Sequence, residues 1–226
     1  MKRRATLALS LGLSLALMAT TAWPAGTLAT SAALIAAAES GDTVALRRLL
    51  DAGAAVDSHD ARQRTALLVA TRAHRVEAAR LLIARGADVN AKDDLQDSPF
   101  LYAGAEGRLE ILRLTLAAGA DLKSTNRYGG TALIPAAHHG HVETVRELLK
   151  TAIAVDHVNR LGWTALLEAI ILGDGGTAYT EIVRLLVARG ANVHLADAQG
   201  ITPLAHAEQR RQTMIIDVLR RGGAQR

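Results

Sequence analysis

Short apolar runs separated by small and polar residues recur along most of this chain at a regular spacing. Five of these runs open with Thr or Ser, continue with Ala or Pro, and then place Leu or Phe. They start at Thr65, Ser98, Thr131, Thr164 and Thr202, the first four 33 residues apart and the last after 38. A fixed period of this length predicts repeated structural units rather than one globular core.

Other positions of the repeat agree with this register. Alanine stands five residues after each start, at Ala70, Ala103, Ala136, Ala169 and Ala207. A Gly-Ala pair such as Gly86-Ala87 or Gly190-Ala191 closes most units, and Gly53-Ala54 extends the register back to a first unit without its leading loop. The Ser or Thr oxygen is expected to cap a helix, and glycine to permit the left-handed turn that ends one.

The pattern therefore predicts two short helices in each unit and an all-α fold. Leucine pairs such as Leu81-Leu82 and Leu148-Leu149 would form the buried face of the second helix. Half of the residues are apolar but only 3% are aromatic, which suits closely packed helices better than a β-sandwich. A single unit cannot bury its own apolar face, so stacking of neighbouring units must make the core.

Residues 131–149, which read TALIPAAHHGHVETVRELL, carry a specific resemblance to the ankyrin-repeat family. The resemblance implies a solenoid of about six helix–turn–helix units with short β-hairpin tips, covering residues 30–226. The expected units are 31–59, 60–92, 93–125, 126–158, 159–196 and 197–226. One departure is clear: where the family has a histidine in its opening motif, these repeats have Leu68, Leu101, Ile134, Leu167 and Ala205.

Residues 1–29 are interpreted as a secretory signal peptide. Three basic residues at positions 2–4 precede the uncharged apolar run 5–18, and small residues follow it. Cleavage is expected after Ala22 or after Ala29. The alternative is an uncleaved membrane anchor, since the run approaches the ~20 residues that span a bilayer. We expect a periplasmic protein, with secretion beyond the periplasm as an open alternative.

Charge and cysteine content exclude several classes of function. The net charge is +4, but three of the cations lie in the expected signal peptide, so the remaining chain carries only +1. This is too small a basic footprint for nucleic acid, and a single Phe offers little for base stacking. The absence of cysteine excludes disulfides, thiolate catalysis and cysteine-ligated zinc. No further membrane-spanning segment is expected after signal cleavage.

Function is expected at the positions that the repeat leaves variable, on the hairpin tips and at the exposed ends of the first helices. Aromatic and arginine side chains there are the usual anchors of protein interfaces. The candidate partner-binding residues are Arg62, Arg64, Leu95, Arg127, Tyr128, His138, His139, Arg160, Leu161, Trp163 and Ile201. Further variable positions are Arg72, Asp94, Asp97, Ile171, Leu172 and Gln199. Trp163 could instead pack on the neighbouring hairpin.

Two local features invite other interpretations. His138, His139 and His141 resemble a metal or haem site, but neighbouring histidines on a helix point in different directions and no further ligand is fixed by spacing. The fifth unit has five extra residues within 173–180. They are expected between its two helices, either as a tolerated insertion or as a second contact loop that uses Tyr179.

No catalytic motif is present: the chain lacks a G-x-S-x-G elbow, an H-E-x-x-H pair and a phosphate-binding loop. We therefore expect a non-catalytic, monomeric module without a cofactor that binds a protein partner through its hairpin tips and concave helix face. One alternative is an accessory protein of oxidative-stress defence that handles a metal or haem for a catalase. The other is a secreted effector that binds a host protein.

Overall fold

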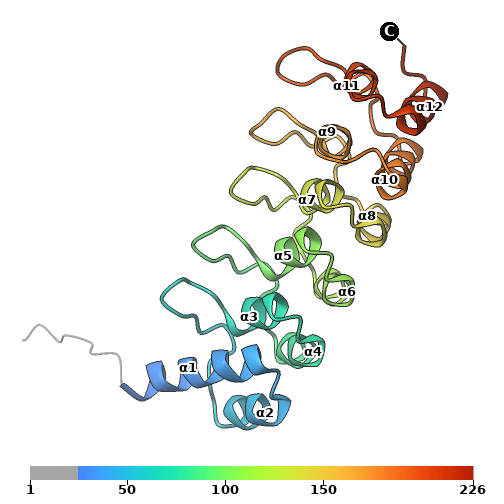
Figure 1. Cartoon of the computed structure of the whole chain (residues 1–226). Coiled ribbons are helices and arrows are strands. Elements are labelled where there is room, and N and C mark those ends of the chain that lie inside the picture. The colour runs from blue at the N-terminus through green and yellow to red at the C-terminus, as the bar shows by residue number, and fades with distance from the viewer. Residues whose placement is uncertain (1–24, 226) are drawn as a thin grey trace, which may run out of the picture.

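The computed structural model describes the backbone of residues 25–225 and side chains from residue 29 onward. Within this range, twelve helices form six successive pairs (Figure 1). The pairs are α1 (Ala25–Ser40) with α2 (Thr43–Asp51), α3 (Ala66–Arg72) with α4 (Val76–Ala84), α5 (Pro99–Ala105) with α6 (Leu109–Ala117), α7 (Leu133–His138) with α8 (Val142–Leu148), α9 (Ala165–Ile171) with α10 (Thr177–Ala188), and α11 (Pro203–Gln209) with α12 (Thr213–Arg221).

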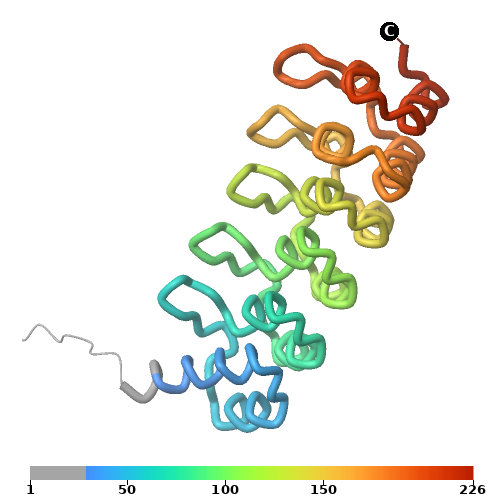
Figure 2. Tube along the Cα trace, viewed as in Figure 1, coloured from blue at the N-terminus to red at the C-terminus, as the bar shows by residue number. Residues whose placement is uncertain are grey.

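The helices stack in two layers, and the loops between units project on one side (Figure 2). Odd-numbered helices contact the odd-numbered helices of adjacent pairs, and even-numbered helices do the same in the second layer. The loops lie beside the odd-numbered layer. This arrangement is the expected all-α solenoid, in which each unit contacts mainly its neighbours.

The predicted caps and buried alanines explain how the units fit together. Thr65 Oγ1 accepts a hydrogen bond from the Leu68 N–H, and Ser98, Thr164 and Thr202 cap α5, α9 and α11 in the same way. All five alanines of the repeated position are fully buried. Apolar side chains replace the family's histidine, and four of the five are buried: Leu68, Leu101, Ile134 and Leu167. Apolar packing thus stabilises the position at which the family has a histidine.

The fourth unit starts its first helix differently because of Pro135. A proline nitrogen carries no hydrogen, so it cannot donate to the Thr131 carbonyl as Val69 donates to Thr65 in α3. The Ile134 N–H donates to the Thr131 carbonyl instead, at 3.1 Å. The Thr131 hydroxyl therefore caps nothing and is buried without a hydrogen-bond partner. A proline at this position of the repeat thus removes the helix cap that α3, α5, α9 and α11 have.

The fourth unit also ends its second helix differently. Gly119 and Gly190, in the neighbouring units, adopt φ of +87° and +95°, whereas Ala152 stands at this position of the fourth unit and does not adopt a left-handed conformation. Helix α8 has 7 residues, against 9 in α6. Arg189 Nε of the next unit donates to the Leu149 carbonyl at 2.9 Å, so a neighbouring side chain satisfies the end of the shortened helix.

The insertion of the fifth unit is packed rather than free. Part of it lengthens α10 to 12 residues, and the Tyr179 hydroxyl donates to the His138 carbonyl at 2.9 Å. Gln212 Nε2 donates to the carbonyls of Ile170 and Gly173. These contacts tie the insertion to the units on both sides, and Tyr179 packs against the preceding unit.

Each predicted β-hairpin tip is a tight hairpin loop closed by two backbone hydrogen bonds, such as Asn159 N–H to Trp163 O and Gly162 N–H to Asn159 O, both at 3.0 Å. In residues 25–225 only His59 and Thr65 pair as a β-bridge, so the hairpins are short. Some neighbouring tips are joined directly: the Arg160 N–H donates to the Tyr128 carbonyl at 2.9 Å. The tips therefore form a connected edge beside α3 to α11.

Helix α1 has 16 residues, whereas α3 has 7. It begins at Ala25, so the expected cleavage position after Ala29 lies inside it, while the position after Ala22 lies outside the described residues. Within the described range, no helix combines the length and the apolar character needed to cross a membrane.

Candidate functional site

Every tip opens with an Asp or Asn that shapes the loop. Its Oδ1 atom accepts the backbone N–H groups two and four residues later, as Asn126 accepts those of Tyr128 and Gly130 at 2.9 and 3.0 Å. The same pair of bonds recurs in the other four tips, at Asp60, Asp93, Asn159 and Asp197. Local side-chain hydrogen bonds of this kind fix tight turns. The tips are thereby set in one orientation along the array.

In the fifth and sixth units, the second polar atom of that side chain contacts an odd-numbered helix. In the fifth unit Asn159 Nδ2 donates to Glu168 at 2.9 Å, and in the sixth unit Asp197 lies 2.7 Å from His206, in each case nine residues later. In the fourth unit the residue nine positions after Asn126 is Pro135, whose side chain can accept nothing. Asn126 Nδ2 has no hydrogen-bond partner among the described residues and lies at the wall of a groove.

This inner groove lies between the tips of units three to five and helices α5, α7 and α9, with a volume of about 340 Å³. Exposed apolar side chains border it: Tyr128 is 52% exposed, Leu161 is 53% exposed and Leu172 is 43% exposed. Few other large apolar side chains of the described residues are this exposed, and those are scattered over α2, the tips and α12. The walls of the inner groove also include Tyr102, Glu106, His138 and Glu168.

Two of the carboxyl groups in the groove are held in surroundings that disfavour their charge. Burial raises the pKa of Glu168, even though Asn159 donates a hydrogen bond to it. Burial and the neighbouring Asp93 raise the pKa of Asp97, against the attraction of Arg127 and Arg72. Arg127 Nη1 lies 4.0 Å from Asp97, and the Arg127 guanidinium also lies over the Tyr128 ring, 4.8 Å from its centroid.

The three histidines do not form a metal site. His138 Nδ1 lies 3.4 Å from Glu168, and His139 Nδ1 lies 2.6 Å from the Ala105 carbonyl. Burial and the neighbouring His139 lower the pKa of both His138 and His141, so these rings are neutral at pH 7. Among the described residues, no three His, Cys, Asp or Glu side chains converge as metal ligands. The geometry thus gives the metal and haem interpretation no support.

Eight of the eleven candidate residues fall into two sets. The groove brings together Arg127, Tyr128, His138, His139 and Leu161, and variable positions Asp97 and Leu172 join them. Arg62, Arg64 and Leu95 line a separate hollow on the tips of units two and three, where Arg64 is paired with Asp60 at 2.6 Å.

The remaining candidates lie elsewhere. Arg160 Nη1 donates to the Arg127 carbonyl at 2.9 Å and so links two tips. Trp163 and Ile201 are half-buried and do not line the groove. Sequence reasoning missed Tyr102, Glu106, Asn126 and Glu168. For Glu168 a signal existed, because it is the one charge inside the apolar run 165–171.

Known proteins match this chain over most of its length. A family model described as "Ankyrin repeats (3 copies)" matches residues 20–93 and 100–197. The crystal structure of an ankyrin repeat domain (ABAYE2397) from Acinetobacter baumannii AYE is 58% identical, with a TM-score of 0.83, and the match covers 85% of this chain and 98% of that one. The ankyrin repeat protein EF0377 is 41% identical, with a TM-score of 0.81 and coverage of 84% and 97%.

Two further matches are more distant or shorter. The ankyrin repeat domain of Bcl-3, described as a unique member of the IkappaB protein family, is 28% identical, with a TM-score of 0.77 and coverage of 85% and 86%. The "Putative ankyrin repeat protein YahD" of Escherichia coli (strain K12) is 46% identical over 57 residues. That match spans 25% of this chain and 28% of the length of YahD.

Proposed function

Because the chain belongs to the ankyrin-repeat family, we propose that it is a non-catalytic, monomeric protein–protein interaction module that binds a protein partner in its inner groove. The observation that carries this proposal is the gathering of Tyr128, Leu161 and Leu172 around one groove. Exposed apolar patches on a soluble protein usually mark interaction sites. An aromatic side chain at the centre of such a patch is a typical anchor, and its loss typically weakens binding by ~2 kcal/mol or more.

The geometry of the tips supports a rigid binding edge. The Asp or Asn that opens each tip holds two backbone N–H groups, and the fourth and fifth tips are joined by the bond from Arg160 to Tyr128. Tyr128 and Leu161 therefore stand on loops that are ordered before a partner arrives. Such preorganisation reduces the entropy lost on binding.

An affinity capture compares the tagged full chain with a Tyr128→Ala/Leu161→Ala variant. A matched control is Val44→Ala/Met214→Ala, because these side chains are 78% and 47% exposed but lie on α2 and α12, outside the groove. We expect the wild type and the control to retain a partner that the groove variant loses. Capture of the same partner by all three proteins would show that the groove is not the site.

We further propose that the protein acts in the bacterial periplasm. This rests on the basic start, the uncharged run 5–18 and the small residues that follow it. Fractionation of cells that express the full chain should place it with periplasmic markers, and its N-terminus should begin at Trp23 or Thr30. A cytosolic protein that retains Met1 and residues 2–4 would contradict this proposal.

A further inference from the structure

We propose that the inner groove selects partner segments in which an arginine or lysine side chain stands between apolar residues, with the cation held by Glu168. This inference rests on the proposed function and adds the chemical nature of the bound segment. Three features of the groove carry it: the Glu168 carboxylate, which pairs with no lysine or arginine of the described residues, the apolar border and the free amide of Asn126.

The carboxylates of the groove are only partly neutralised within the fold. Asp97 already lies between Arg72 and Arg127, at 3.9 and 4.0 Å. Within the described part of the chain, no lysine or arginine forms an ion pair with Glu106 or Glu168. Glu168 meets the Asn159 amide and the neutral ring of His138, at 2.9 and 3.4 Å, and His139 is the further group that attracts its charge. A lysine or arginine from a partner would therefore supply the permanent positive charge that Glu168 lacks within the fold.

The apolar border suits the rest of such a side chain and its neighbours. Arginine and lysine carry an aliphatic stem that packs on apolar surface while the charged end reaches a polar site. Tyr128, Leu161 and Leu172 provide that surface and are close to half exposed or more. Residues on either side of the cation should accordingly be apolar, because they would cover the same three side chains.

Asn126 adds a hydrogen-bond donor for the backbone of the segment. In the fifth and sixth units the equivalent side chain bonds within the fold to Glu168 or His206. Pro135 removes such a partner in the fourth unit, so Asn126 Nδ2 remains free at the groove wall while Oδ1 shapes the tip. A backbone carbonyl of an extended segment would accept from this donor.

The opposite preference, for an acidic segment, has less support. Arg127 is the lining arginine, and its charge is already shared between Asp97 and the face of Tyr128. An anion in the groove would also share it with the carboxylates of Glu106 and Glu168. Like charges brought together at an interface weaken binding.

Selection from a displayed library of random peptides of about twelve residues tests the inference on the full chain. We expect the wild type to enrich an arginine or lysine flanked by apolar residues. Replacing the enriched arginine by its neutral isostere citrulline should weaken binding by about tenfold or more, measured by fluorescence anisotropy. The Glu168→Gln variant should lose this discrimination, whereas Glu143→Gln, with the same change in charge on the outer helix α8, should keep it.

The outcomes separate this inference from the proposed function. Peptides without a basic residue, or with an acidic one, that still depend on Tyr128 and Leu161 would leave the groove as the site and overturn its proposed selectivity. Peptides that bind equally to the Tyr128→Ala/Leu161→Ala variant would overturn both. Failure to enrich any peptide would overturn the inference, while the capture experiment would still test the function.

Discussion

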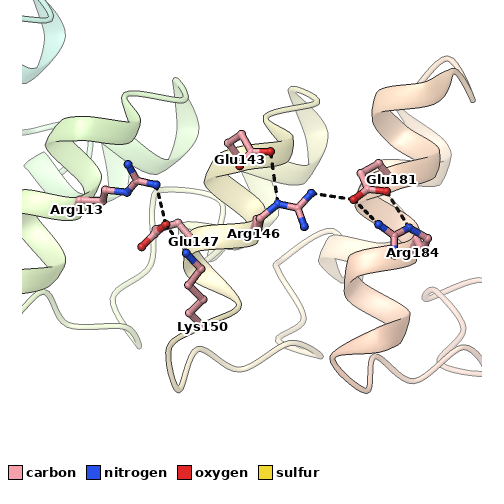
Figure 3. A network of polar contacts seen from close by, with 7 residues as sticks. All are labelled: Arg113, Glu143, Arg146, Glu147, Lys150, Glu181 and Arg184. Carbon is pink, nitrogen blue, oxygen red and sulfur yellow. Dashed lines mark hydrogen bonds and ion pairs between the residues drawn. The ribbon is translucent and has the colours of Figure 1, made fainter.

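The outer helices and the inner groove carry charged residues in opposite circumstances. On α6, α8 and α10, Glu147 lies between Arg113 and Lys150, at 3.1 and 2.9 Å, and Glu181 lies between Arg146 and Arg184, at 2.9 and 2.6 Å (Figure 3). Hydrogen bonds from Lys150 and Arg113, and from Arg184 and Arg146, lower the pKa of these two glutamates. In the groove, burial raises the pKa of Glu168 instead.

The charges on the outer helices stabilise the fold, whereas the charge of Glu168 in the groove destabilises it. The outer pairs join consecutive units, because Arg113 reaches from α6 to α8 and Arg146 from α8 to α10. Glu168 is 5% exposed and, among the described residues, pairs with no lysine or arginine; burial outweighs the attraction of His139 and raises its pKa, so its ionisation destabilises the folded state. Carboxylates held at such a disadvantage in a groove are typical of binding sites.

The largest effect is expected for Asn159→Ala. This change removes the acceptor of two backbone N–H groups and leaves Glu168 buried without its hydrogen-bond donor. We expect the free energy of unfolding to fall by about 2–4 kcal/mol in urea denaturation. Asn126→Ala is the matched control, since it loses the same two N–H contacts but strands no carboxylate, and it should lower stability by about 1–2 kcal/mol. Equal losses would mean that Glu168 does not depend on Asn159.

Glu168→Gln should raise stability at pH 7. Glutamine keeps an oxygen that can accept from Asn159 and carries no charge to bury, so we expect a gain of about 1 kcal/mol in the free energy of unfolding. The measurement is urea denaturation at constant ionic strength. A loss of stability would show that the ionised carboxylate supports the fold and would end the contrast with the outer helices.

The pH dependence should differ in sign between the two regions. The raised pKa of Glu168 means that the unfolded chain releases this proton first, so the folded state loses stability as pH rises from 4.5 through the raised value. The lowered pKa of Glu181 gives stability that is present above 4.5 and is lost as pH falls through the folded value. In melting curves from acid to neutral pH, Glu168→Gln and Glu181→Gln should both match the wild type at acid pH. Towards neutral pH, Glu168→Gln should melt above the wild type and Glu181→Gln below it. If both variants shifted in the same direction, the opposite pKa shifts of the two glutamates would be refuted.

The smallest effect is expected for Glu181→Gln at neutral pH. It breaks the pairs with Arg146 and Arg184, which are partly exposed, so the melting temperature should fall by about 1–2 °C. The difference should shrink in high salt, because exposed ion pairs are screened. A difference that persists at high salt would indicate that Glu181 contributes through packing rather than charge.

The repeat register made much of the fold predictable from the sequence. Thr65 and Ser98 cap their helices, because a cap depends on neighbours within one unit, and the repeated alanines are buried, because every unit packs on its neighbours in the same register. The hairpin tips were predictable for the same reason as the caps, since the Asp or Asn that opens each tip accepts the loop N–H groups of its own unit.

The groove was harder to predict because it depends on contacts between units. Leu161 and Tyr128 could be found as exposed variable positions, whereas the free amide of Asn126 follows from a proline nine residues away. The burial of Glu168 depends on how α9 packs on α7, which no single unit determines. Trp163 was a candidate because of its residue type, but its side chain is half-buried, whereas that of Leu161, two residues earlier on the same loop, is exposed.

The most direct test of the central claim measures stability and binding on the same Glu168→Gln variant. We infer that the buried charge of Glu168 lowers the stability of the fold and strengthens the binding of a partner. The melting temperature should rise relative to the wild type, while the affinity for a library-selected arginine peptide should fall by about tenfold. A variant that melts lower, or that binds the peptide as tightly as the wild type, would contradict the account.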